Sequence, residues 1–377
     1  MKITQIRVYR HGIEVADGRY QMAISAVSTL DSTVVELVTD EGLSGFGETT
    51  PLGPTYQPQH ALGARAAIAE MAPTLLGVNP LRTGLVRRAM DRALTGHNYA
   101  KSAIDVACWD LLGKVRGERV CDLLGGTDRS AVGSYFGVMP DTTSRTAEAA
   151  RQREAAGYTR LQIKVGGRPL AHDIEATRAV ADAVSPTTKL LVDANRGWTM
   201  RDTIEFSLAC RDVRLSIENP CRTYDEHRAI AEKLNHPLFL DECTTDLDVI
   251  TKAIVDGVAQ GFGMKLSRVG GLTPLRTVRD LCVAHGIPLT IDDTWGGDLT
   301  AAATVHMGAT VPDPFYEGTW ISYPYQKPAY RCLTPAVQPG DGMIPIPTGS
   351  GLGVEPDLAA WDSPVGIYAL RWPRPVG

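Results

Sequence analysis

Three carboxylates stand at the ends of three consecutive short apolar runs. Asp193 ends LLVD, Glu218 ends LSIE, and Asp241 follows LFL. Short apolar runs are typical of buried strands, so each charge lies where a strand leaves the core. Three clustered carboxylates raise one another's pKa unless a cation joins them, and ligands that are all oxygen favour a hard cation. We predict that these three residues bind one Mg²⁺. The alternative is that each carboxylate caps the following helix or pairs with an arginine such as Arg196 or Arg268.

Two lysines end similar runs, Lys164 in RLQIK and Lys265 in GMK. A desolvated lysine near a cation has a lowered pKa and can serve as a base near neutral pH. If the two lysines flank a bound molecule, one can take a proton from one face and the other can return it to the opposite face. The alternative is that the lysines only neutralise the carboxylates.

The elements that carry these residues recur at a regular interval. From Lys164 to Asp193 is 29 residues, and the following steps to Glu218, Asp241, Lys265 and Asp292 are 25, 23, 24 and 27 residues. Helical patterns fill the intervals, which indicates βα units and a parallel sheet. Eight strand candidates are present: GSYFGV, RLQIKV, LLVDAN, LSIEN, LFLDE, GMKLS, LTIDD and FYEG.

The predicted fold class is α/β, a (β/α) TIM-type barrel of seven or eight strands. An open doubly wound sheet is the rival, but it would more often carry a glycine-rich phosphate turn, and none follows the first strands. In a barrel the carboxyl ends of the strands form the catalytic face. With eight strands in a ring, Lys164 on the second and Lys265 on the sixth would face each other across it.

The first 50 residues alternate like strands, with a turn at 40–42, and residues 60 to 124 have a helical pattern. We therefore predict an α+β domain over residues 1–127, the barrel over 128–330, and a proline- and glycine-rich segment over 331–377 that packs back on the first domain.

The composition restricts the partners. The net charge is −5 without a basic patch, which argues against nucleic acid. The first residues lack the apolar core of a signal peptide and no run reaches about 18 apolar residues, so we expect no membrane partner and a cytoplasmic protein. The seven cysteines have no metal-ligand spacing, and we interpret most as reduced core residues.

The sequence as a whole resembles the mandelate racemase/muconate lactonizing enzyme branch of the enolase superfamily. The motifs that carry the resemblance are QIK (162–164), DAN (193–195), ENP (218–220), DEC (241–243), KLSRVGG (265–271), DDTWGG (292–297), AIDVACWDLLGK (103–114) and LLGG (123–126). The resemblance implies a capping N-terminal domain, Mg²⁺ on Asp193, Glu218 and Asp241, and a homo-oligomer. It also implies a small carboxylate substrate whose α-proton a base removes, leaving an enediolate.

Two residues depart from much of the family. Gln162 stands where a first lysine is common, and we expect it to contact the substrate carboxylate. Asp292 and Asp293 end the seventh strand where the mandelate racemase type would have a histidine. The second departure argues against mandelate or sugar-acid chemistry and favours a mechanism with two lysines.

A closer similarity is to the subgroup that acts on proline derivatives, 4-hydroxyproline betaine 2-epimerases and cis-3-hydroxy-L-proline dehydratases. It rests on GPTYQPQHALGARAA (53–67), GHNYAK (96–101), LQIKVGGRP (161–169), GFGMKL (261–266), DDTWGGD (292–298) and EGTW (317–320). By this likeness Tyr56 and Trp320 would flank a quaternary ammonium, for which aromatic faces are suited. Asp292 or Asp293 would add a counter-charge.

The first hypothesis is therefore a Mg²⁺-dependent racemase or epimerase of a proline betaine-like substrate, with Lys164 and Lys265 as the two acid/base groups. The second is a cis-3-hydroxy-L-proline dehydratase that uses the same residues. Enzymes of dipeptides, muconates or sugar acids and a non-catalytic member remain as alternatives. Around this core, Asn195 and Glu242 are expected to support the metal ligands and Lys265. Trp198 is expected near the mouth of the site, and Trp109 in the core.

Overall fold

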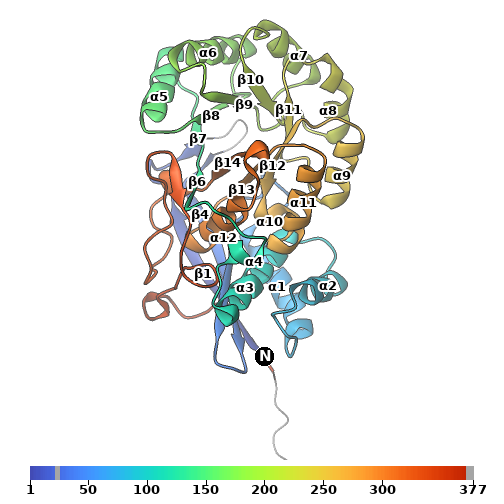
Figure 1. Ribbon diagram of the computed structural model, residues 1–377, viewed down its shortest axis with the longest axis vertical. Helices are drawn as coiled ribbons and strands as arrows, with labels where there is room; N and C mark the ends of the chain where they lie inside the picture. Colours follow the sequence, from blue (N-terminus) through green and yellow to red (C-terminus); the bar gives the residue numbers. More distant parts are fainter. Residues whose placement is uncertain (22–25, 371–377) are drawn as a thin grey trace, which may run out of the picture.

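An antiparallel sheet forms the N-terminal part of the protein (Figure 1). The computed structural model describes residues 1–21 and 26–370. The strand order is β16-β1-β4-β5, with β1 at Ile3–Glu14, β4 at Thr29–Thr39, β5 at Ser44–Thr49 and β16 at Gly366–Ala369. The predicted turn joins β4 to β5, and Gly42 has a φ of 78° there, in the left-handed region that glycine adopts readily. Two short strands, β2 (Tyr20–Gln21) and β3 (Ala26–Val27), pair antiparallel with each other.

Four helices follow the first strands of this sheet, and α1 and α3 pack on it: α1 (Ala61–Leu75), α2 (Thr83–Ala93), α3 (Asn98–Arg116) and α4 (Val120–Leu123). Helix α3 is almost entirely buried, and a Cβ added to Gly47 would lie 2.0 Å from the carbonyl oxygen of Ala103. Glycine in β5 therefore allows α3 to approach the sheet backbone. Trp109 is buried in this layer, as predicted, and its indole N–H donates to Thr273 Oγ1 at 2.9 Å.

The second part is a parallel eight-stranded sheet in sequential order, from β7 to β14. A parallel bridge between Ser134 and Thr319 brings the first and last strands together. The predicted barrel is thus confirmed, and the open sheet is excluded. The strands are β7 (Phe136–Val138), β8 (Arg160–Lys164), β9 (Lys189–Asp193), β10 (Leu215–Glu218), β11 (Leu238–Leu240), β12 (Gly261–Lys265), β13 (Leu289–Asp292) and β14 (Tyr316–Trp320).

Helices connect the barrel strands, and most of them form an outer arc around the strands (Figure 1). They are α5 (Thr143–Ala155), α6 (Leu170–Ala183), α7 (Met200–Ala209), α8 (Tyr224–Ile230), α9 (Leu247–Val255), α10 (Leu266–Val269), α11 (Leu272–Ala284) and α12 (Asp298–Ala309). None of the helices in the described ranges is long and apolar enough to cross a membrane. All seven cysteines are free and most are buried, as expected.

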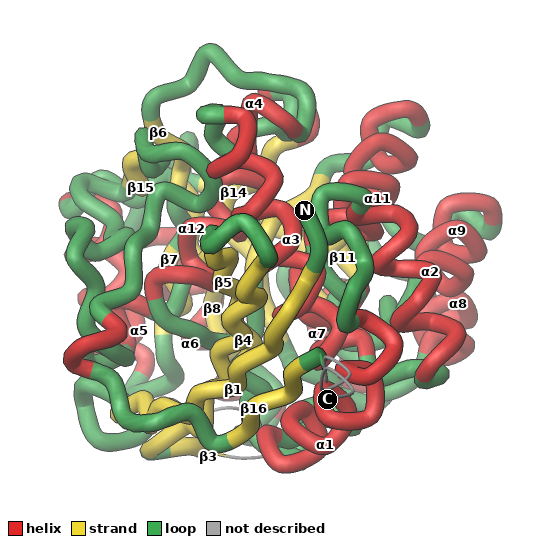
Figure 2. Tube along the Cα trace, turned by 90° about the horizontal axis from the view of Figure 1, so that it is seen from below, coloured by secondary structure: helices red, strands yellow, loops and turns green. Residues whose placement is uncertain are grey.

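The C-terminal segment contacts both parts of the molecule. Its strand β15 (Met343–Pro345) pairs with β6 (Ala131–Gly133) at the start of the barrel. Strand β16 pairs antiparallel with β1, and Figure 2 shows the two strands side by side. Short 3₁₀ helices complete the chain: η1 (Ala231–Lys233), η2 (Asp313–Phe315), η3 (Tyr323–Tyr325) and η4 (Leu358–Ala360).

Candidate active site

The register of the barrel places the predicted residues in two rows at the carboxyl ends of the strands. Lys164, Asp193 and Glu218 are direct partners across β8, β9 and β10. Lys265, Asp292 and Trp320 are direct partners across β12, β13 and β14. Because β8 and β12 lie four strands apart, the two lysines enter the site from opposite sides.

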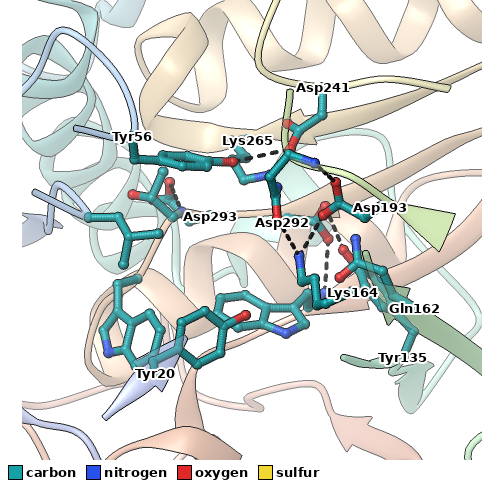
Figure 3. Close-up of a pocket in the computed structure, with 15 residues that line it drawn as sticks. Tyr20, Tyr56, Tyr135, Gln162, Lys164, Asp193, Asp241, Lys265, Asp292 and Asp293 are labelled. Atoms are coloured by element: carbon teal, nitrogen blue, oxygen red, sulfur yellow. Dashed lines mark hydrogen bonds and ion pairs between the residues drawn. The ribbon is translucent and has the colours of Figure 1, made fainter. Parts of the chain in front are cut away.

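Each predicted metal ligand accepts a hydrogen bond from a neighbouring side chain, and Figure 3 draws those of Asp193 and Asp241. Lys164 Nζ donates to Asp193 Oδ2 at 2.5 Å, and Lys265 Nζ donates to Asp241 Oδ2 at 2.6 Å. Gln162 Nε2 donates to Glu218 Oε2 at 2.5 Å.

Asp241 also accepts a bond from Arg268 on its other oxygen, so the arginine pairing weighed from the sequence is realised at this one carboxylate. Arg196 instead donates to the backbone carbonyl of Tyr56. Its guanidinium therefore holds the loop that carries Tyr56 and pairs with none of the three carboxylates.

The carboxylate oxygens of Asp193, Glu218 and Asp241 are ligands that suit a hard divalent cation, although the three side chains do not converge on one point. Within residues 1–21 and 26–370, no group of three His, Cys, Asp or Glu side chains is close enough to hold a metal ion. All three carboxylates are nevertheless buried and supply only oxygen, the ligand type that Mg²⁺ prefers. Burial, and then the charges of Asp193 and Asp241, raise the pKa of Glu218 well above its usual value. A cation among them would relieve that repulsion.

Both lysines are held in the charged form. Burial is the largest single effect and lowers the pKa of Lys164, but the interactions with Asp193, Tyr20 and Glu218 together outweigh it, and the pKa is raised above its usual range. Burial and the charge of Arg268 lower the pKa of Lys265. The charges of Asp241, Asp292 and Glu218 together outweigh them, so this pKa is raised as well. While the lysines pair with these carboxylates, their pKa values therefore do not show the lowering that we expect beside a cation. A Mg²⁺ ion that attracted Asp193 and Asp241 away from the lysines would lower the pKa of both.

Asn195 and Glu242 form a supporting layer beneath the lysine on β8. Asn195 Nδ2 donates to Glu242 Oε1 at 2.8 Å, and its Oδ1 accepts from Lys164 Nζ at 3.4 Å. Glu242 makes no hydrogen bond to Lys265, whose partner is Asp241. Burial, followed by the charges of Asp241 and Asp193, raises the pKa of Glu242 to about 7.

Asp292, the last residue of β13, and Asp293, which follows it, differ in which of their carboxylate oxygens accept hydrogen bonds. Asp292 Oδ2 accepts from Tyr135 Oη at 3.0 Å and from Thr290 Oγ1 at 2.7 Å, and Oδ1 accepts from the Trp320 N–H at 3.0 Å. Both oxygens of Asp292 are thus occupied by neighbouring donors. Asp293 uses only Oδ1 in this way.

Aromatic side chains enclose a small cavity above the two lysines. Tyr56 donates its hydroxyl to Asp241 Oδ2 at 3.2 Å. On another wall, Trp295 lies edge-on to Tyr20 at 5.1 Å and to Trp320 at 5.8 Å between ring centroids. The space among these side chains is about 440 Å³ when the part that opens to solvent is included, and only about 40 Å³ of it is free for a water-sized sphere. So little enclosed space favours a compact substrate.

The cavity brings together all of the predicted catalytic and substrate-contacting residues, and Asp193, Asp241 and Asn195 with them. Its lining includes Tyr56, Gln162, Lys164, Lys265, Asp292, Asp293 and Trp320. Sequence reasoning missed other lining residues, namely Tyr20, Leu52, Tyr135 and Trp295. Tyr20 and Leu52 come from the N-terminal domain, and nothing local in their sequence marks them as part of a site.

The prediction for Trp198 is wrong. Its ring packs on Phe206 of α7 with 4.6 Å between ring centroids, and its indole N–H donates to Asp173 at 3.2 Å. Asn195 and Arg196 have positive φ values of 43° and 67°, so the chain turns sharply after the strand. Trp198 therefore stays buried among the outer helices and does not line the cavity.

The N-terminal domain is fixed to the barrel beside the site by Glu48. This buried carboxylate accepts from the backbone N–H groups of Gly297 (2.9 Å) and Thr300 (3.2 Å) at the start of α12. It also accepts from the hydroxyls of Ser32 at 2.6 Å and Tyr330 at 2.8 Å. Leu52 lies four residues after Glu48, and Trp295 lies two residues before Gly297. Both side chains line the cavity, so this contact fixes two parts of its wall.

Known proteins match both parts of the chain. Residues 4–125 match the mandelate racemase/muconate lactonizing enzyme N-terminal domain, and residues 145–360 match the enolase C-terminal domain-like family. The chain belongs to the mandelate racemase/muconate lactonizing enzyme branch of the enolase superfamily. This confirms the resemblance seen in the sequence and makes the protein an enzyme of that superfamily, whose members bind Mg²⁺.

Individual superfamily relatives differ in their reactions. The chain is 39% identical over 356 residues to a cis-3-hydroxy-L-proline dehydratase of Roseibium aggregatum, covering 92% of this chain and 97% of the relative. It is 29% identical to a hydrophobic dipeptide epimerase of Enterococcus faecalis, covering 82% and 87%. A crystal structure of an enolase superfamily member from Roseovarius nubinhibens complexed with magnesium superposes with a TM-score of 0.92 at 34% identity, covering 98% and 100%.

Proposed function

We propose that this superfamily member removes the α-proton of a cyclic amino acid carboxylate and, as its main reaction, dehydrates a cis-3-hydroxyproline. The observation that carries the proton abstraction is the pair of lysines entering one cavity from opposite sides. The small cavity and the dehydratase relative of 39% identity support the substrate class.

Each residue has a definite role in this proposal. Asp193, Glu218 and Asp241 would hold Mg²⁺, which when bound supplies the positive charge that stabilises an enediolate. One lysine accepts the α-proton, and its amine form requires that it leave its carboxylate partner. Gln162 and the aromatic side chains orient the ring. Tyr20 and Tyr56 keep their hydroxyl protons, because burial raises the pKa of both phenols, and they exclude water from the reacting carbon.

Epimerisation at C2 of a proline betaine is the second candidate. The observation that favours it is the same opposition of Lys164 and Lys265, because inversion at one carbon needs a base on one face and an acid on the other. The aromatic wall of Trp295 and Trp320 would suit a quaternary ammonium. The first step is identical in both reactions, and only the fate of the carbanion differs.

The test follows proton NMR spectra in deuterated buffer with Mg²⁺, using cis-3-hydroxy-L-proline, L-proline betaine and 4-hydroxyproline betaine in separate samples. We expect loss of the hydroxyproline signals and appearance of a cyclic imine. A new diastereomer without loss of mass would establish the epimerase instead.

The Lys164→Ala and Lys265→Ala variants test the catalytic pair. We expect at least one of them to lose α-proton exchange by about 10²-fold or more, the usual contribution of a general base. Lys252→Ala on the outer helix α9 is the matched control and should behave as wild type. Unchanged exchange in both site variants would contradict the assignment of the lysines.

A further inference from the structure

We propose that Asp293 is the general acid that protonates the departing 3-hydroxyl group. The inference rests on the proposed dehydration and adds the residue that completes it. Removal of the α-proton needs only a lysine, but hydroxide is a poor leaving group and departs readily only as water. A dehydratase therefore needs a second proton donor beside C3.

The two carboxylate oxygens of Asp293 differ in their hydrogen bonds. Oδ1 accepts from the Thr294 N–H at 2.7 Å, from the Ser267 N–H at 3.3 Å and from the Ser267 hydroxyl. Oδ2 is buried and has no hydrogen-bond partner in the part of the chain that the structure describes. Since three donors already point at Oδ1, a proton on this carboxyl group belongs on Oδ2.

Asp293 lies on the lining of the cavity that also contains both lysines. Figure 3 shows it on the Tyr56 side of the pocket. Its side chain is only 3% exposed, so the unpartnered oxygen is not satisfied by bulk water. A buried polar atom without a partner is destabilising, and a substrate hydroxyl bound at Oδ2 would satisfy it.

Other buried carboxylates near the site do not fit the role. Asp292 also lines the cavity, but donors occupy both of its oxygens. Glu242 and Asp173 each have one buried oxygen without a hydrogen-bond partner among the described residues, yet neither lines the cavity. Among these carboxylates, Asp293 alone combines an open oxygen with access to the substrate.

The environment also keeps part of Asp293 protonated. Burial raises the pKa of Asp293 to about 6, against the opposing effect of its hydrogen bonds from Ser267 and Thr294 and the nearby charge of Lys265. At pH 7 about a tenth of such a carboxyl group carries its proton. This is the range in which a carboxylic acid serves efficiently as a general acid.

The step balances in atoms and charge. A lysine amine takes the α-proton from C2, and the C2 electron pair forms the C2–C3 double bond as the C3–O bond breaks. Asp293 gives its proton to the departing oxygen, so that water leaves. The resulting cyclic enamine tautomerises to the imine. The lysine then releases its proton to solvent, and the Asp293 carboxylate takes one up.

The Asp293→Asn variant separates the two proton transfers. Its amide oxygen can still accept from Ser267 and Thr294, but its amide group cannot deliver a proton. With cis-3-hydroxy-L-proline and Mg²⁺ in deuterated buffer, we expect α-proton exchange to persist while water loss falls about 10²-fold or more. Asp173→Asn is the control, because it alters another buried carboxylate that lies outside the cavity.

A second substrate distinguishes chemistry from folding. With cis-3-fluoro-L-proline the leaving group is fluoride, which needs far less proton assistance, so the defect of Asp293→Asn should shrink strongly. An equal loss of exchange, water loss and fluoride loss would show that the variant only disturbs the site and would overturn the inference. Undiminished dehydration by Asp293→Asn would overturn it as well. If wild type itself neither exchanges nor dehydrates the hydroxyproline, the proposed function fails, and the role of Asp293 fails with it.

Discussion

Replacing Glu48 should weaken the attachment of the N-terminal domain to the barrel. The protein should therefore lose more stability than it does when a surface charge is removed. Glu48 is 1% exposed and accepts hydrogen bonds from both domains. Its donors include two backbone N–H groups at the start of α12, those of Gly297 and Thr300. The hydroxyls of Ser32, Tyr330 and Thr50 also donate to this carboxylate.

The magnitude follows from which donors can find another acceptor. In Glu48→Leu the hydroxyl groups can rotate toward other acceptors, but the two backbone N–H groups cannot. A buried donor without a partner costs about 1 to 3 kcal/mol, so the two together predict a loss of about 2 to 6 kcal/mol. In Glu48→Gln the amide oxygen still serves the two N–H groups, and what is lost is the charge at a helix N-terminus. That loss is about 0.3 to 2 kcal/mol.

The assay is urea denaturation followed by tryptophan fluorescence and circular dichroism, with the midpoint and the slope fitted separately. We expect the midpoints to fall in the order wild type, Glu48→Gln, Glu48→Leu. Glu70→Leu, an exposed position on α1, is the control and should change stability by less than about 0.5 kcal/mol. A Glu48→Leu protein as stable as the Glu70→Leu control would refute the reasoning.

Two further changes test the site and the fold. A Cβ at residue 263 would lie 2.6 Å from Glu218 Oε1, so Gly263→Ala should displace this carboxylate and weaken Mg²⁺ binding, by about tenfold or more in calorimetric titrations. Burial lowers the pKa of His306 to about 4 from 6.5, so the stability it contributes is present above pH 6.5 and is lost as the pH falls through 4. The loss is at most about 3 kcal/mol, and His306→Asn should flatten the decline of the urea midpoint between pH 7 and pH 4.

The barrel and the positions of its charged strand ends are readable from the sequence because both depend on local patterns. Short apolar runs at intervals near 25 residues predict the parallel strands, and the first charge after each run marks where the strand leaves the core. The strand register then brings Lys164 beside Asp193 and Lys265 beside Asp292. The identity of the three metal ligands remains a prediction that rests on the chemistry of their oxygens.

The rest of the cavity depends on contacts between distant parts of the chain. Tyr20 meets Trp295 only because the N-terminal domain lies over the carboxyl ends of the strands, and no local pattern contains that contact. Trp198 shows the opposite case, since its place after a strand end suggested the site. The left-handed turn at Asn195 and Arg196 directs it toward α7 instead. Backbone turns of this kind depend on tertiary packing, which overrides the local pattern.

In the proposed mechanism the opposed lysines make the first step common to several reactions, and the groups around C3 decide the outcome. One lysine would remove the α-proton, and the other, on the opposite side of the same carbon, could return a proton there. Elimination competes only when a leaving group at C3 lies beside a donor. Proline betaine has no such group, so its carbanion can only be protonated again, whereas a 3-hydroxyproline has both routes open. The ratio of inverted to dehydrated product from one substrate therefore reports how well the proton donor at C3 competes with the second lysine. Replacing Asp293 with asparagine removes that donor and should shift the ratio toward inversion.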